Sequence, residues 1–129
     1  MRFKPTGYTP FMLMAQTCAL LGFACYAVVL TTLQEEWRLS NLQSGLIASA
    51  FFFGYMLIVP LATALTDRVD AKKVYLIGGL SATCGLLGMS LFAYNFWTAL
   101  IFMALNGAGL AGTYMPGLKI LSDRIKTGE

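Results

Sequence analysis

Residues 45–66 contain no charged side chain, and three other stretches of the chain are apolar over a similar length. An α-helix needs about 20 such residues to cross about 30 Å of hydrocarbon. A soluble protein of 129 residues could not surround four helices that are apolar on every face. The stretches also lack the alternation of polar and apolar residues that strands of a membrane barrel show. The sequence therefore predicts an all-α membrane protein whose four transmembrane helices lie near residues 10–33, 45–66, 74–95 and 97–121.

The positions of the basic residues predict how these helices are oriented. Charged residues make up 12% of the chain, about half of the usual share in soluble domains. Every Lys and Arg except Arg38 lies before the first apolar stretch, between the second and third, or at the end of the fourth. Lys and Arg in short loops are retained in the cytoplasm. We therefore expect a multi-pass protein of the cell membrane, with both termini and the loop at residues 67–73 in the cytoplasm.

The same distribution of charge bears on the binding partners of the chain. The basic residues are divided among three flanks, whereas nucleic-acid binding typically gathers them on one face. Membrane topology explains this division directly. The sequence therefore predicts the lipid bilayer as the surroundings of the chain, and it predicts no nucleic-acid partner.

The sequence does not favour an enzyme, a metal site or a cofactor. Cys18, Cys25 and Cys84 all lie inside apolar stretches without metal-ligand spacing, and the chain has no histidine. All of the Asp and Glu residues lie outside the stretches, so acid–base and nucleophile–base arrangements cannot form within the bilayer. We therefore expect no enzymatic activity, no bound metal and no cofactor.

Small residues recur at helix-packing spacing inside the apolar stretches. Such residues let membrane helices approach closely, where lipid supplies no hydrophobic drive for association. The sequence therefore predicts a packed helical bundle, without distinguishing a transporter from any other bundle. The residues are Ala50 with Gly54, Ser81 with Gly85, and a stripe of Ala104, Ala108 and Gly112, with Gly107 and Gly109 beside it.

Two prolines and one amide are candidate functional residues within the stretches. Pro60 and Pro116 each remove one helical hydrogen bond, which for Pro116 is the bond to the Gly112 carbonyl. Pro116 with Gly112 is therefore a candidate hinge, although kinked membrane helices need not move. Asn106 is a candidate for facing a solute path, and interhelical hydrogen bonding is the alternative role for its amide.

Two segments carry a resemblance to a known family, the major facilitator superfamily of transporters. The first resembles that family's second helix, cytoplasmic loop and third helix, and it reads WRLSNLQSGLIASAFFFGYMLIVPLATALTDRVDAKKVYLIGG. The second resembles the glycine-rich fourth helix, and it reads LNGAGLAGTYMPGLKILSDR. With the first stretch, the resemblance covers residues 8–124. The family's loop signature is G-x-x-x-D-R-x-G-R/K-R/K, and here it lies between two apolar stretches on the positive side.

The resemblance assigns a gating loop to four residues of this chain. Asp67 and Arg68 match the acidic and basic pair of the signature, and Lys72 with Lys73 matches its closing basic residues when one place of slippage is allowed. In the family, this loop helps to hold the cytoplasmic gate between two six-helix halves during alternating access. An Asp at a helix end, flanked by basic residues, can pair with charges or a helix N-terminus on a neighbouring bundle. The alternative is a solvated turn that only enforces topology.

Three positions depart from the pattern of the family. Thr63 and Asp70 stand where the signature has glycines. Those glycines permit a tight helix contact and a turn, so the resemblance does not carry these two features over to this chain. Met103 occupies the place where many members have an arginine in the fourth helix.

The function that the resemblance implies is secondary active transport of a small solute by alternating access, with or without a coupling ion. The family uses about twelve helices in two halves. We therefore expect residues 1–129 to form a single transmembrane domain, an incomplete N-terminal half that needs the remaining transporter helices and is not competent alone. The alternative function is a non-transporting four-helix scaffold or subunit that packs against another membrane protein. A small proton-coupled exporter is disfavoured, because no stretch contains a carboxylate.

Overall fold

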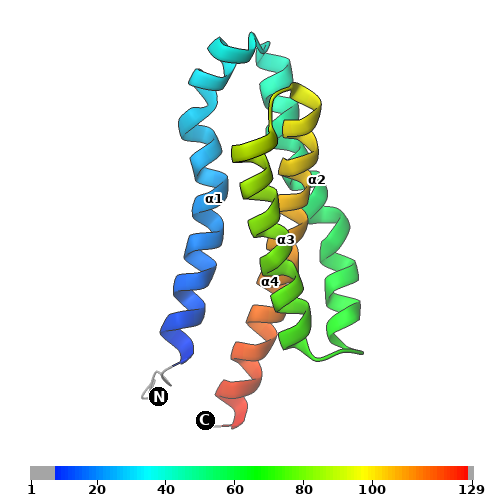
Figure 1. Ribbon diagram of the computed structural model, residues 1–129. Helices are drawn as coiled ribbons and strands as arrows, with labels where there is room; N and C mark the ends of the chain where they lie inside the picture. Colours follow the sequence, from blue (N-terminus) through cyan, green and yellow to red (C-terminus); the bar gives the residue numbers. More distant parts are fainter. Residues whose placement is uncertain (1–7, 128–129) are drawn as a thin grey trace.

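The computed structural model describes residues 8–127, and they form four helices in an up-and-down arrangement (Figure 1). The described residues contain no strand, and all four helices are long and apolar enough to cross a membrane. The start of the first helix, the end of the fourth helix and the turn between the second and third helices all lie at the same end of the bundle (Figure 1). The predicted all-α transmembrane class is therefore confirmed. The helices are α1 Tyr8–Trp37, α2 Asn41–Thr66, α3 Ala71–Phe92 and α4 Phe96–Thr127.

Most helices extend beyond the apolar stretches that predicted them. The first stretch ends near residue 33, but α1 continues to Trp37, and α4 continues to Thr127 rather than ending near 121. The third helix is shifted toward the N-terminus, because Asp70 caps it and it begins at Ala71, three residues before the predicted start. The reason is that an apolar stretch marks where hydrocarbon ends, whereas helical hydrogen bonding continues into the polar flanks.

The α1–α2 connection is short because local signals stop one helix and start the next. Arg38 has a left-handed backbone (φ 51°), and the Leu39 amide donates to the Gln34 carbonyl at 3.0 Å, as at many helix ends. Ser40 then caps α2, since its hydroxyl accepts from the Gln43 amide at 3.2 Å and the Gln43 side chain accepts from the Ser40 amide at 3.0 Å. This reciprocal capping box fixes where α2 begins.

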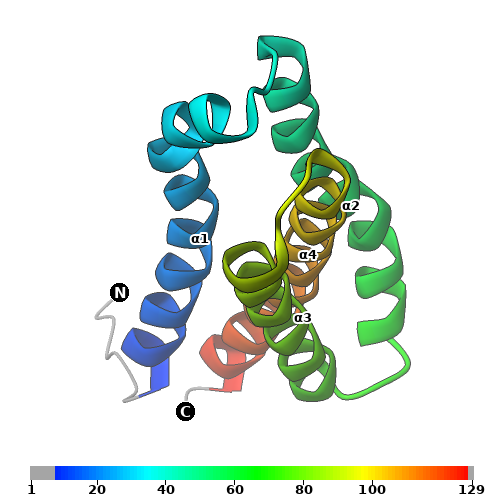
Figure 2. The ribbon, with the colours of Figure 1, turned by 45° about the horizontal axis from the view of Figure 1, so that its top comes forward.

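The fourth helix lies between α2 and α3 and makes close contact with both (Figures 1 and 2). A Cβ atom added at Gly54 of α2 would overlap the Ala104 carbonyl of α4. On the other side, a Cβ at Gly85 of α3 would lie 2.7 Å from the Asn106 amide nitrogen. The backbones are therefore as close as small residues allow, and the prediction of a packed bundle is confirmed.

One detail of the predicted packing is corrected. Ala104 and Gly112 do not form one contact stripe, because Ala104 meets α2 while Gly112 meets α3 at Gly78. The physical reason is that α4 is buried on two sides, so its small residues are divided between contacts with α2 and contacts with α3.

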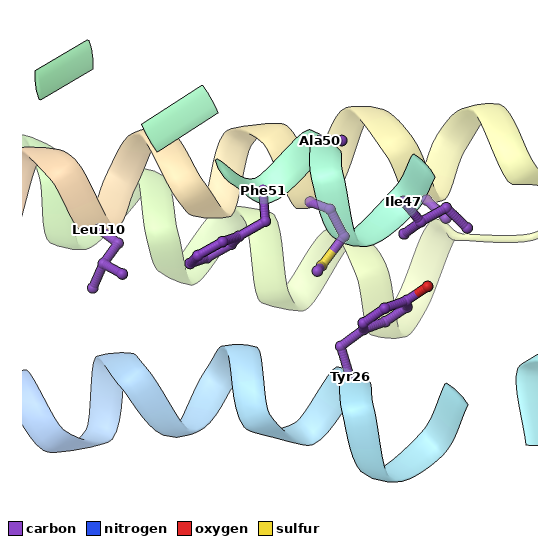
Figure 3. Packing of buried hydrophobic residues seen from close by; sticks show 7 residues of the cluster. Tyr26, Ile47, Ala50, Phe51 and Leu110 are labelled. Atoms are coloured by element: carbon purple, nitrogen blue, oxygen red, sulfur yellow. The ribbon is translucent and has the colours of Figure 1, made fainter. Parts of the chain in front are cut away.

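The first helix is attached differently from the other three. It contacts the other helices at only a few places, and most of its surface is exposed. Tyr26 is the α1 residue that belongs to the buried hydrophobic cluster, and it reaches toward Ile47 and Phe51 of α2 (Figure 3). From α4, Ala99, Met103 and Leu110 belong to the same cluster. Met103 is 1% exposed, so an apolar side chain fills the place where the family's pattern has an arginine.

Candidate functional site

The α2–α3 turn is built by the ends of two helices with almost no loop between them. Asp67 follows the last residue of α2, and the Val69 amide donates to the Leu65 carbonyl at 2.8 Å. Asp70 then caps α3, its carboxylate accepting from the Lys72 amide at 3.1 Å. Side-chain capping of this kind satisfies an amide that the helix cannot.

Asp70 shows how this chain manages without the glycine of the family's signature. Its φ is −53°, an ordinary value for any residue, so the turn needs no left-handed backbone at this position. Asp70 instead supplies a carboxylate that caps α3. Thr63, at the other departure, is exposed, and its hydroxyl donates to the Val59 carbonyl one turn earlier at 2.8 Å.

An ion pair joins this turn to the fourth helix. The Lys119 ammonium of α4 lies 2.9 Å from the Asp67 Oδ1 atom, and it also donates to the Thr66 carbonyl at 2.9 Å. The carbonyl is one of those that the end of α2 leaves without a helical partner. Lys119 therefore holds the last turn of α2 through two bonds, a charged one and a neutral one.

Sequence reasoning missed Lys119 as a partner of the loop. It was interpreted only as part of the basic flank that ends the fourth stretch, and 52 residues separate it from Asp67. Its position three residues after Pro116 gives no signal of this contact. The pairing becomes visible only when the packing of α4 against α2 is known.

The other predicted loop residues are not joined to Asp67. Arg68, Lys72 and Lys73 are exposed, and within residues 8–127 their side chains form no ion pair. Of the four predicted loop residues, the structure therefore joins only Asp67 to α4. The other three, Arg68, Lys72 and Lys73, are exposed basic residues of the same turn and are called the basic rim below.

The predicted hinge lies in a tightly packed part of α4. Pro116 is fully buried, and α4 is helical on both sides of it. A Cβ at Gly112 would lie 2.9 Å from the Gly78 Cα atom of α3, so α3 closely supports the turn preceding the proline. Bending at this point would have to move α4 against α3, and the hinge stays a prediction.

Asn106 is inside the bundle rather than on an open surface. It is 2% exposed, and its Nδ2 atom has no hydrogen-bond partner among the described residues. A buried amide without a partner costs about 1–3 kcal/mol. The role of Asn106 in a solute path stays a prediction, and its unpaired donor is compatible with that role.

Polar side chains fasten α1 to α2 at the end of the bundle opposite the turn. The Tyr26 hydroxyl donates to the Ser44 carbonyl at 3.0 Å, and the Gln34 side-chain amide donates to the Ser44 hydroxyl at 3.0 Å. The sequence alone does not reveal this cluster, because Gln34 and Ser44 are separated by the helix connection. It is the main polar attachment of α1 within the described part of the chain.

These features define a multi-pass α-helical membrane protein with an ion-paired turn at the end of its second helix. The model of the Major Facilitator Superfamily matches residues 12–129, and the chain belongs to that family. This is a family of transporters, so transport across a membrane is the general function that the match supports. No solved structure gave a significant match.

Three curated relatives illustrate the range of the family. "Probable sphingolipid transporter spinster homolog 1" of Arabidopsis thaliana is 33% identical over 63% of this chain and 16% of its own length. "Niacin transporter NiaP" of Acinetobacter baylyi is 33% identical over 77% of this chain and 22% of its own length. "L-fucose-proton symporter" of Escherichia coli is 33% identical over 64% of this chain and 19% of its own length. The chain thus spans about a fifth of the length of these relatives.

Proposed function

We propose that this chain supplies the first four helices of a secondary active transporter that moves a small solute by alternating access. The observation that carries the proposal is the ion pair between Asp67 and Lys119, formed where the family's loop signature falls. On this proposal residues 1–129 form one transmembrane domain that functions together with further transporter helices. The comparisons give the scaffold alternative no support.

The ion pair joins α2 and α4 of the same bundle rather than two bundles, so it would act as a latch that holds the charged turn in place at one end of its own bundle. Asp67 is 70% exposed and Lys119 39%, so the pair can open without leaving a buried charge. An exposed pair is worth about 0–1 kcal/mol. A contact of this size shifts a two-state equilibrium by up to about fivefold, so the pair can hold the turn against α4 in one state of the transporter and release it in another.

The orientation of the latch follows from the basic rim. Arg68, Lys72 and Lys73 lie at the same end as the latch, and the positive-inside rule puts such residues in the cytoplasm. We therefore propose a cytoplasmic gate in a protein of the cell membrane, with both termini on the same side.

The named relatives differ in what they carry, so their names do not select one solute for this chain. They do provide a panel to test: niacin, L-fucose and a sphingolipid. The name of the L-fucose relative also makes a proton the first coupling ion to test.

The test compares uptake of this panel by cells that express the whole protein as wild type, as Asp67→Asn or as Glu36→Gln. Glu36 is an exposed carboxylate at the opposite end of the bundle and controls for loss of one charge. We expect Asp67→Asn to lower the transport rate at unchanged membrane insertion, and Glu36→Gln to leave the rate unchanged. Equal rates in wild type and Asp67→Asn would refute the latch.

A further inference from the structure

A small cavity with polar walls lies between α1, α3 and α4, in the half of the bundle that carries the α2–α3 turn. Its walls include Gln16 from α1, Tyr75 from α3, and Tyr114 with Gly117 from α4. A Cβ at Gly117 would lie 3.3 Å from the Tyr75 ring and 3.9 Å from the Gln16 Oε1 atom. Three helices therefore bring hydrogen-bonding side chains to one place within the apolar spans.

The Gln16 amide is not satisfied by the helices around it. Its Nε2 atom is buried and has no hydrogen-bond partner among the described residues. The next residue differs, because the Thr17 hydroxyl donates to the Leu13 carbonyl of its own helix at 2.8 Å. A polar side chain inside a membrane span is costly unless a partner or water satisfies it, and such residues typically face a bundle interior or a water-filled cavity. Gln16 therefore needs a partner that the described helices do not supply.

The size of the cavity decides between a solute and water. It encloses about 50 Å³, whereas sites for small molecules usually enclose about 300–1,000 Å³. A buried water needs only about 10–15 Å³ of such space, together with about two to four polar partners. One amide and two phenol hydroxyls can both donate and accept, so they meet this need. The size and the lining therefore favour water over a solute or a lipid chain.

We propose that ordered water occupies this cavity and links the Gln16 amide of α1 to the tyrosine hydroxyls of α3 and α4. The site depends on how the helices pack and not on the transport function proposed above. It gives α1 a second polar attachment, at the end opposite the direct hydrogen bonds that Tyr26 and Gln34 make to Ser44. A bridging water is enthalpically nearly as good as a direct hydrogen bond, so it satisfies the amide without requiring direct contact between these side chains.

X-ray hydroxyl-radical labelling of the whole protein in lipid nanodiscs tests the proposal. Radicals formed from bound water oxidise the side chains beside it, and Met12 and Tyr114 of the cavity wall are oxidisable reporters. We expect both to be labelled in the wild type. Gln16→Leu nearly keeps the size of the side chain but removes its hydrogen bonds. It should lower the labelling by about fivefold, the effect of losing one hydrogen bond.

Two further variants separate the cavity from other changes in α1. Thr17→Val removes a neighbouring hydroxyl that does not line the cavity, so it should leave the labelling unchanged relative to Met56 of α2, which lies outside the cavity. Tyr114→Phe keeps the ring and should lower the labelling of Met12 as Gln16→Leu does.

Three results would overturn the proposal. Absence of labelling at Met12 and Tyr114 in the wild type would show that a side chain from another segment fills the cavity. Unchanged labelling of Met12 in Gln16→Leu or in Tyr114→Phe would show that the radicals come from water elsewhere. An equal loss in Thr17→Val would show a general change in α1 rather than loss of a bound water.

Discussion

Gly54 of α2 lies directly against the backbone carbonyl of Ala104 in α4, with no room for a side chain between them. This contact, and the similar one between Gly107 and the Phe51 carbonyl, brings two membrane helices to backbone distance. Lipid and protein interior are equally apolar, so it is close packing rather than hydrophobic burial that holds such helices together.

Replacing Gly54 with valine is therefore expected to destabilise the bundle. The added atoms would meet a backbone carbonyl that cannot rotate away, and overpacking of this kind costs about 1–3 kcal/mol. Thermal unfolding of the purified protein in detergent measures the loss. Gly45→Val is the matched control, because a Cβ at Gly45 would meet nothing within 4 Å. Equal unfolding temperatures for the two variants would contradict the described α2–α4 contact.

The Asp67–Lys119 ion pair predicts a small but specific coupling between α2 and α4. In a double-mutant cycle with Asp67→Asn and Lys119→Gln, we expect a coupling energy of about 0.2–1 kcal/mol, because both groups are partly exposed. Lys119 should cost more than Asp67 when replaced alone, since it also binds the Thr66 carbonyl. Reversal of the charges, with Asp67→Lys and Lys119→Asp together, should recover part of the coupling. Strictly additive single variants would show that the two residues do not interact.

Asn106 gives opposite predictions for stability and for transport. Its Nδ2 atom is buried without a partner in the described structure, so Asn106→Leu is expected to leave the protein as stable as before or to stabilise it by about 1–3 kcal/mol. If Asn106 faces the solute path, the same variant should lower transport of the solute by the whole protein. Thermal unfolding and uptake, measured on one preparation, separate these effects. A less stable variant would show that the amide has a bonding partner.

The sequence predicted the helices and their contacts much better than the partners of individual residues. Uncharged apolar stretches require membrane helices, and the spacing of Ala50 with Gly54 correctly predicted a close contact face. Helical periodicity says which residues share a face, but it does not say which neighbour that face meets. For that reason Ala104 and Gly112 were placed on one stripe, although they contact different helices.

The candidate site was predicted in part, for a similar reason. The charged turn at Asp67 could be found from the sequence because it interrupts apolar stretches and matches a family signature. Lys119 could not, because its contact with Asp67 depends on how α4 lies against α2. The structural role of Asp70 was also missed. Comparison with the signature identifies this position only as a missing glycine, and it does not indicate that Asp70 caps α3.

Four membrane crossings with the α2–α3 turn in the cytoplasm underlie the proposed gate. Val69 lies at the tip of this turn and is 39% exposed, so a cysteine placed there would be accessible from its own side of the membrane. Cys18, Cys25 and Cys84 would first be replaced by alanine, because all three are exposed in the described bundle.

A membrane-impermeant maleimide applied to intact cells is the most direct measurement. We predict that Val69→Cys is labelled only after the cells are permeabilised, whereas Glu36→Cys, at the opposite end of the bundle, is labelled without permeabilisation. Labelling of Val69→Cys in intact cells, with Glu36→Cys protected, would show that the turn faces outward and would contradict the proposed cytoplasmic gate.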